Sequence, residues 1–289
     1  MFLGDNMKKV LLIIIVVICL IIGLKIYVNY NVNSYQIPVL MYHQVMYDED
    51  YIEEVDTIKY STLKKHFDYF KKHDIEPISM DDFYCWKQGK CKMKGKKVVI
   101  TFDDGFYSFK YLVEPLLKEY GFNATNFVIG EVTGETTPEY NPHEYGTIGK
   151  KDIRKHSKYV EYGSHTYGMH KYIDGKRRIT MMSKKEMQED IDKMKEIKDF
   201  KYMSYPFNTD NKDYIKLLKK NHYKMAFKNE SEKALKTDNR FRMPRINVNE
   251  DYEEFKKIFE SKKYNNRYGS GIIRKIFITI ERLIGIKLM

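Results

Sequence analysis

The sequence predicts an α/β protein whose parallel strands are joined by helices, preceded by a single apolar helix at the N-terminus. From about residue 37 to residue 248, short β-rich apolar runs alternate with amphipathic helical patterns. This order is typical of a parallel sheet with crossover helices, either open or closed into a barrel. The chain has 289 residues, of which 43% are hydrophobic, enough for one large domain or two small ones.

The strand candidates are rich in Val, Ile, Phe and Tyr and are short, as strands of a buried sheet are. They span residues 37–43, 96–102, 124–130, 158–165, 200–207, 223–229 and 241–248. The helical candidates show apolar residues at a 3.6-residue period, and several have Ser or Asp near the start. They span residues 61–74, 111–121, 183–199 and 212–222.

The N-terminal run predicts a membrane anchor. Lys8 and Lys9 precede an apolar stretch that continues past Lys25, which can extend its ammonium toward the interface. We therefore expect a cytoplasmic stub at residues 1–9, a transmembrane segment at 10–28 and a linker at 29–36. A cleaved signal peptide is the alternative, but no small-x-small cleavage site follows the run. The lysines on the short side place the rest of the chain outside the cytoplasm.

Charge and cysteine content narrow the class of protein. The formal charge of +11 is spread along the chain, which makes an acidic surface or polymer a plausible neighbour. Zinc-finger spacing, an RNP-like aromatic box and a basic arm are all missing from the sequence, so nucleic acid is not expected as a partner.

Cys85 and Cys91 could form one small disulfide or remain free thiols. The basic tail at residues 263–289 fits an amphipathic helix on a membrane or one packed on the domain. The start codon, Met1 or Met7, stays open.

Candidate functional residues lie at the carboxyl ends of several predicted strands, the edge at which parallel α/β folds bind ligands. They are His43, Asp103, Asp104, His165, Phe207 and Arg245. Asp103 and Asp104 form a simple turn with Gly105, or they divide labour between metal binding and proton transfer.

His165 and His170 stand five positions apart, a spacing that puts them on one face of neither a helix nor a straight strand. If they act together, the chain between them must turn, and Gly168 is the residue expected to supply a positive φ. Two imidazoles and one carboxylate form a three-ligand set that suits catalytic Zn²⁺, another divalent ion or non-haem iron.

Five short motifs together resemble the polysaccharide deacetylase family, the NodB-like carbohydrate esterases. They are "VLMYHQV", "TFDDG", "ATNFVIG", "SHTYGMH" and "SYPFN", within residues 37–248. The extra residue between the two histidines is similar to the branch of exported poly-β-1,6-N-acetylglucosamine deacetylases of biofilm exopolysaccharide systems. The resemblance implies a distorted (β/α) barrel of about seven parallel strands, in a domain at residues 37–262.

The resemblance also implies roles for individual residues. Asp103 would be the general base, and Asp104, His165 and His170 would bind a divalent ion, expected to be Zn²⁺, with Co²⁺ or Ni²⁺ as alternatives. The backbone N–H of Phe207 would match the family's oxyanion donor.

Two departures from the family pattern are evident. Ser204 stands where many relatives carry an arginine that holds the catalytic aspartate, and Arg245 is predicted to replace it. The family's late general-acid histidine is missing after residue 222, and His43 is predicted to protonate the leaving amine.

The expected function is metal-dependent de-N-acetylation of N-acetylglucosamine in an extracellular polysaccharide by a membrane-anchored enzyme, with release of acetate. The expected polymer is poly-β-1,6-N-acetylglucosamine, and exopolysaccharide synthesis or export machinery is a possible partner. Peptidoglycan glycan strands are the alternative substrate. A non-catalytic carbohydrate-binding protein on the same fold is the alternative from another class.

Overall fold

Seven parallel strands close into a barrel in the computed structural model, which describes residues 5–53, 56–266, 275–276 and 278–279. The barrel strands are β1 (Val39–Tyr42), β12 (Met243–Asn247), β11 (Met225–Asn229), β10 (Tyr202–Ser204), β7 (Val160–Ser164), β6 (Ala124–Val128) and β5 (Lys96–Phe102). Each pairs with the next in parallel, and β5 closes the barrel against β1. A short strand, β4 (Ile75–Pro77), extends the sheet at the start of β5. The predicted α/β barrel is confirmed.

Two apolar clusters explain why the strands are apolar on both faces. One fills the barrel interior with side chains such as Val99, Phe127 and Phe227, and it includes Phe83 and Trp86 of α3 (Met80–Lys87). Helix α3 therefore closes the amino-terminal end of the barrel, leaving the carboxyl end for polar side chains. The second cluster lies between the barrel and the outer helices.

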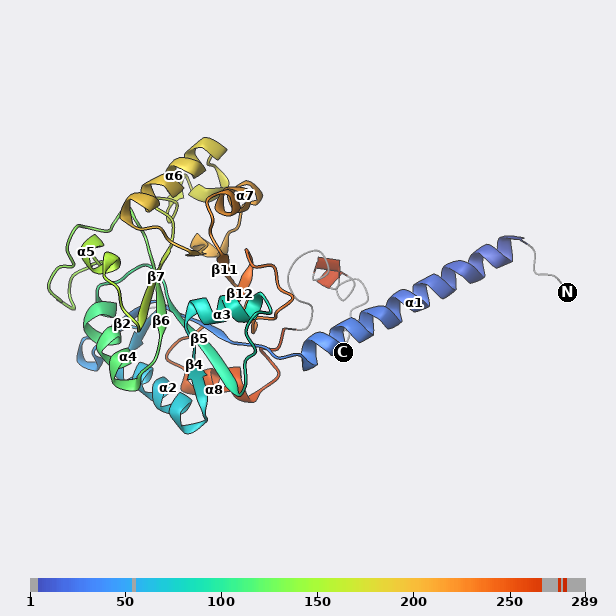
Figure 1. Cartoon of the computed structure of the whole chain (residues 1–289), viewed down its shortest axis with the longest axis horizontal. Helices are drawn as coiled ribbons and strands as arrows, with labels where there is room; N and C mark the ends of the chain where they lie inside the picture. Colours follow the sequence, from blue (N-terminus) through green and yellow to red (C-terminus); the bar gives the residue numbers. More distant parts are fainter. Residues whose placement is uncertain (1–4, 54–55, 267–274, 277, 280–289) are drawn as a thin grey trace.

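The outer helices surround the barrel (Figure 1). They are α2 (Tyr60–Lys72), α4 (Glu114–Tyr120), α5 (Lys150–Arg154), α6 (Lys184–Ile197), α7 (Lys212–Lys220) and α8 (Tyr252–Glu260). Four of them, α2, α4, α6 and α7, match the helices that the sequence predicts. A π-helical turn at Phe109–Val113 leads into α4. At the start of α6, Ser183 and Glu186 form a capping box that satisfies free backbone N–H groups.

Several elements were not predicted from the sequence. They are α3, α5, α8, the paired strands β2 (Gln44–Met46) and β3 (Thr57–Lys59), and the hairpin β8 (Tyr172–Ile173) and β9 (Lys176–Arg177). All are short, so their patterns span too few turns or alternations to stand out from loops.

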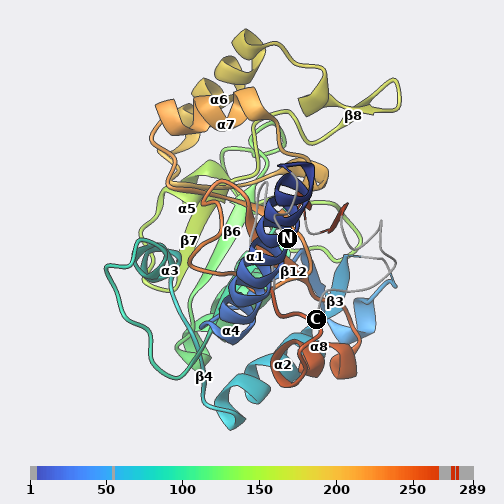
Figure 2. The same ribbon diagram turned by 90° about the vertical axis from the view of Figure 1, so that its right-hand side faces the viewer.

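The N-terminal helix α1 (Asp5–Asn33) projects from the domain (Figures 1 and 2). Its stretch from Met7 to Tyr30 is long and apolar enough to cross a membrane, and the side chains there are exposed. The chain then enters the barrel at its amino-terminal end, where the Tyr35 hydroxyl donates to the Gly95 carbonyl at 2.6 Å.

Cys85 and Cys91 form a disulfide next to this junction. Most of the predicted tail, at residues 267–274, 277 and 280–289, lies outside the described residues.

Candidate active site

The barrel brings the predicted site residues to one rim. His43 follows β1, Asp103 and Asp104 follow β5, and His165 follows β7 at the carboxyl ends of these strands. Phe207 follows β10, and Arg245 lies within β12. Residues from five separate strands therefore converge on one end of the barrel, opposite to α3.

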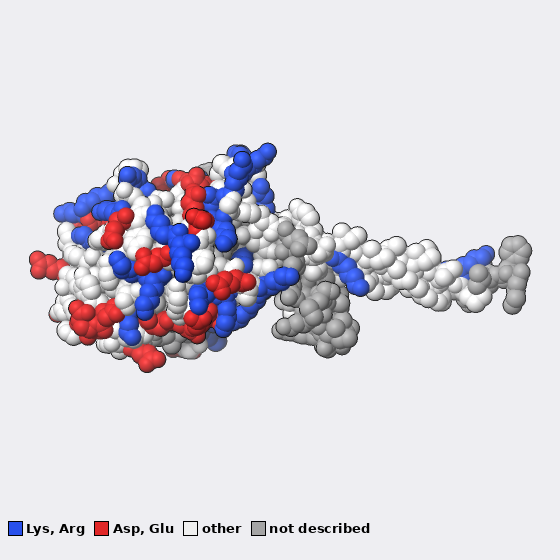
Figure 3. All heavy atoms as spheres, turned by 90° about the horizontal axis from the view of Figure 1, so that it is seen from below, with Lys and Arg blue, Asp and Glu red and all other residues white. Residues whose placement is uncertain are grey.

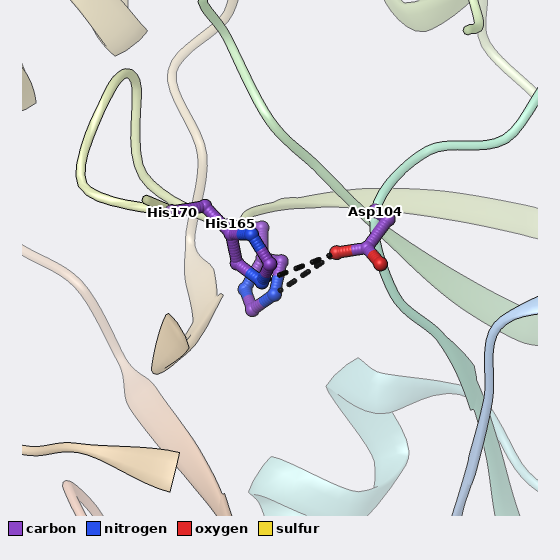
Figure 4. Close-up of side chains that lie close together, drawn as sticks. All are labelled: Asp104, His165 and His170. Carbon is purple, nitrogen blue, oxygen red and sulfur yellow. Dashed lines mark ion pairs between the residues drawn. The ribbon is translucent and has the colours of Figure 1, made fainter. Parts of the chain in front are cut away.

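Asp104, His165 and His170 form a three-donor cluster on this rim (Figure 4). The Oδ1 atom of Asp104 lies 3.4 Å from Nε2 of His165 and 3.5 Å from Nε2 of His170. One ligand atom from each residue lies within 4.8 Å of the other two. The two rings lie side by side, with centroids 4.7 Å apart and planes tilted by 50°.

This cluster fits a divalent metal ion. Two ligand atoms about 2.1 Å from a tetrahedral Zn²⁺ lie about 3.4 Å apart, close to the separations seen from Asp104 Oδ1. That Oδ1 atom is buried and has no hydrogen-bond partner among the described residues, an arrangement that is expensive unless a cation satisfies it. The donor set of one carboxylate and two imidazoles suits Zn²⁺ and other divalent transition metals.

The turn between the two histidines is not built as the sequence predicts. Gly168 is not among the residues with positive φ; Thr166 is, with φ of 71°. A Cβ at Gly168 would lie 3.2 Å from the Glu131 carboxylate and 3.4 Å from an Arg178 nitrogen, so these two side-chain ends would have to shift by a few tenths of an ångström to admit one. The expectation that Gly168 supplies the left-handed residue was wrong.

A buried carboxylate that the sequence analysis missed holds this turn. Asp190 of α6 accepts hydrogen bonds from the backbone N–H groups of Tyr167 at 2.9 Å and Gly168 at 2.8 Å. Thr166 adds a hydroxyl that accepts from the Met169 N–H at 3.3 Å. The position of His170 therefore depends on a helix that supplies no metal donor.

The Nδ1 atom of His165 lies 2.8 Å from the Ser204 carbonyl. A carbonyl only accepts, so the proton is on Nδ1, and Nε2 presents its lone pair toward Asp104. The neighbouring strand β10 thus fixes both the tautomer and the direction of the first imidazole.

Asp103 lies beside this cluster, with Oδ2 3.8 Å from Nε2 of His165, and forms a buried ion pair with Arg245. The guanidinium donates from Nη1 to Oδ1 at 2.7 Å and from Nη2 to Oδ2 at 2.6 Å. Ser204 donates its hydroxyl to Oδ2 at 3.0 Å, and Thr101 accepts from Arg245 at 3.1 Å. Asp103 and Arg245 are 3% and 2% exposed. The two adjacent carboxylates therefore have different partners and different environments.

The charges at the rim shift the protonation of these groups. Burial alone would raise the pKa of Asp103, but Arg245 and His165 outweigh it and hold the pKa below its usual value. The pKa of Asp104 is likewise lowered, against the effect of burial, chiefly by His165. Burial and the neighbouring His165 lower the pKa of His170 to about 4. His170 is therefore neutral at physiological pH, as a metal ligand must be.

His43 and an aromatic pair border the cluster. His43 is half-buried, and its Nδ1 lies 3.7 Å from the carboxylate of Asp56. The ring of Phe207 contacts that of His170 in a tilted arrangement with centroids 4.4 Å apart, and Tyr172 of β8 contacts Phe207 in the same manner at 4.6 Å. Phe207 has positive φ, 51°, which turns the chain sharply at the end of β10. The exposed Tyr172 ring was not singled out from the sequence, since tyrosine is frequent along the whole chain.

The closed parallel barrel places the three-donor cluster beside a second, ion-paired aspartate, an arrangement that suits hydrolysis assisted by a bound metal ion. The sequence matches the family described as polysaccharide deacetylase over residues 90–226. The chain therefore carries a polysaccharide deacetylase domain in this region.

Two staphylococcal proteins are similar to this chain over about two thirds of its length. The chain is 26% identical over 204 residues to a poly-β-1,6-N-acetyl-D-glucosamine N-deacetylase of Staphylococcus aureus, covering 68% of this chain and 69% of the relative. It is 28% identical over 200 residues to the Staphylococcus epidermidis protein of the same name, covering 65% and 67%.

Solved structures share the fold. IcaB from Ammonifex degensii has a TM-score of 0.65 at 18% identity, covering 80% of this chain and 98% of that one. The Streptococcus pyogenes deacetylase PplD, in complex with acetate, has a TM-score of 0.62 at 18% identity, covering 76% and 95%.

Proposed function

We propose that this protein is a metal-dependent de-N-acetylase of an N-acetylglucosamine polysaccharide, with poly-β-1,6-N-acetylglucosamine as its substrate. The observation that carries the proposal is the juxtaposition of the Asp104, His165 and His170 donors with the Arg245-paired Asp103. The names of the staphylococcal relatives support the choice of polymer.

In this proposal Asp104, His165 and His170 hold the divalent ion. When bound, the ion polarises the amide carbonyl and makes water more acidic. Asp103 then accepts the proton of the attacking water, because Arg245 keeps it ionised and the buried ion pair fixes its direction.

The remaining rim residues serve the tetrahedral intermediate and the leaving group. The Phe207 backbone N–H would donate to the oxyanion. His43 would protonate the departing glucosamine nitrogen, which balances the proton taken up by Asp103. The Asp56 carboxylate lies 3.7 Å from Nδ1 of His43, on the side of the ring that would be turned away from the leaving group.

We further propose that α1 anchors the chain in the membrane, with the deacetylase domain at residues 37–262 outside the cytoplasm. Lys8 and Lys9 flank the apolar stretch at its short end. The Cys85–Cys91 disulfide supports an oxidising compartment. In such a location the enzyme would meet secreted polysaccharide.

The test is acetate release from poly-β-1,6-N-acetylglucosamine by the full chain in detergent, before and after chelation, with Zn²⁺, Co²⁺ and Ni²⁺ added back. Peptidoglycan serves as the comparison substrate. We expect release from the first polymer that chelation stops and metal restores.

An Asp104→Asn variant should lose this activity. The matched control is Asp174→Asn, on the exposed turn of the β8–β9 hairpin. Release only from peptidoglycan would overturn the proposed polymer, and unchanged release after chelation would overturn the role of the metal.

A further inference from the structure

A loop at the amino-terminal end of the barrel carries a concentrated positive charge that the deacetylase site does not use. This basic loop, residues 88–96, joins α3 to β5 and contains Lys90, Lys92, Lys94 and Lys96 at alternate positions. All four lysines are exposed, and none forms an ion pair with another residue that the structure describes. Their ammonium groups are therefore available to an external anion.

The basic loop is held in a fixed shape. The Cys85–Cys91 disulfide ties its start to α3, and the N–H of Gly89 donates to the Trp86 carbonyl at 2.9 Å. Lys236 lies over the Trp86 ring at 5.8 Å, which adds another cation beside the loop. The four charges are thus presented together and need little ordering on contact with a partner.

The basic loop also lies where α1 meets the domain. The Tyr35 hydroxyl is bonded to the carbonyl of Gly95, between Lys94 and Lys96, and the Tyr35 ring contacts Trp86 at 6.3 Å. The membrane-spanning stretch ends at Tyr30, and five residues reach at most about 17 Å. The polar head groups on each side of a bilayer occupy about 5–8 Å, so the lysines lie within reach of them.

Figure 3 shows blue side chains of Lys and Arg around the base of the α1 stalk. The catalytic rim lies at the other end of the same strand, because Lys96 begins β5 and Asp103 follows it. Seven strand residues separate these ends by about 23 Å. A contact made by the basic loop would therefore leave the rim free.

We propose that the basic loop docks onto anionic phospholipid in the leaflet from which α1 emerges. This inference rests on the proposed membrane anchoring by α1. Docking fixes the barrel with its amino-terminal end on the bilayer and its deacetylase rim facing away, toward polymer outside the cell. A lysine close to an anionic surface favours the docked state about fivefold, so four lysines together favour it several-hundredfold.

Phospholipid is favoured over a soluble anionic polymer because of the tether. The Tyr35 contact keeps the basic loop beside the bilayer at all times, whereas a polymer would have to enter the gap between domain and membrane.

The test uses the full chain reconstituted in vesicles, either of phosphatidylcholine alone or with about one third phosphatidylglycerol. Flotation after a high-salt wash first establishes that α1 is inserted. Lysine modification by an uncharged amine reagent, read by mass spectrometry, then reports on docking. We expect Lys90, Lys92, Lys94 and Lys96 to react at least about fivefold more slowly in the anionic vesicles, with protection lost in 1 M salt.

Two variants distinguish a contact made by the basic loop from a general effect of the protein's positive charge. The loop variant K90Q/K92Q/K94Q/K96Q should abolish the lipid-dependent protection of Lys236. The control variant K184Q/K185Q/K212Q/K216Q removes the same charge from α6 and α7, away from the stalk, and should leave that protection unchanged.

Inserted chains whose loop lysines react equally in both vesicles would overturn the docking proposal alone. Failure to float would instead refute the anchoring by α1. Protection that appears in neutral vesicles only when a soluble anionic polymer such as polyglycerol phosphate is added would assign the basic loop to a polymer and overturn the lipid assignment.

Discussion

Replacing Arg245 with methionine tests the ion pair that orients the proposed general base. Methionine keeps most of the side-chain volume but removes both hydrogen bonds to Asp103, which would retain only the Ser204 hydroxyl at 3.0 Å. The desolvation of Asp103 by burial is then offset only by weaker neighbours, chiefly His165, so its pKa rises. Removing one partner of a buried ion pair destabilises a protein by about 3–5 kcal/mol. For a domain of this size, that loss lowers the Tm by about 6–20 °C.

The chain provides a matched control in the same strand region. Arg242 pairs with Asp210 at 2.6 Å, but its side chain is 30% exposed and Asp210 keeps a second partner, Lys228, at 2.7 Å. Arg242→Met should therefore lower the free energy of unfolding by less than about 1 kcal/mol.

The assay combines urea unfolding of each variant with the rate of acetate release. Arg245→Met should lower both stability and kcat. The double variant Arg245→Met/Asp103→Asn, which leaves no unpaired charge, should recover most of the stability but none of the activity. The reasoning is refuted if Arg245→Met unfolds as readily as Arg242→Met, or if the double variant is less stable than Arg245→Met alone.

Three further predictions concern a proton donor, the histidine turn and a buried acid. His43→Gln should lower kcat by about 10²–10⁴ while bound metal, measured by mass spectrometry, stays at the wild-type ratio; near-normal turnover would remove His43 from the mechanism. Asp190→Ala should weaken metal binding by about 10–100-fold through loss of the turn that places His170, whereas Asp192→Ala, on the exposed face of α6, should not change metal binding. Burial raises the pKa of Asp238 to about 7, so the folded state resists its ionisation and stability falls as pH rises from about 4 to about 7. Asp238→Asn should raise the free energy of unfolding at pH 8, by up to about 4 kcal/mol, and leave it unchanged near pH 4; an equal effect at both pH values would contradict this.

The barrel strands could be predicted because their signal is local. A run such as residues 96–102 is apolar on both faces and ends in a carboxylate pair, so it indicates a buried parallel strand whose end lies at a binding edge. Helix α3 has no such signal. It is only 8 residues long, and it is recognisable as the closure of the barrel only after Phe83 and Trp86 are seen to pack inside it.

The candidate site was predictable in its donors but not in their supports. Asp104 lies in the motif "TFDDG", and His165 and His170 lie in the motif "SHTYGMH"; both motifs can be recognised from the sequence alone. Asp190 is one of several acidic residues on α6, and its neighbours Glu189 and Asp192 are exposed. Only the packing of α6 against the barrel decides which carboxylate turns inward. The hydrogen bonds that result join Asp190 to Tyr167 and Gly168, which lie 23 and 22 positions away in the sequence.

Backbone strain at the rim indicates that the residues holding the metal donors in place matter as much as the donors themselves. Among the eight described non-glycine residues with positive φ, five are Asp, Asn or His, which tolerate that conformation; Thr166 and Phe207, a β-branched and an aromatic residue, tolerate it poorly. A β-branched or aromatic residue in the left-handed region costs about 1–2 kcal/mol. Glycine at position 166 would relieve the strain, but it would also remove the hydroxyl that accepts from the Met169 N–H, next to His170. The turn therefore keeps a strained residue whose side chain fixes the second imidazole, which a relaxed and more mobile glycine turn would leave free to move.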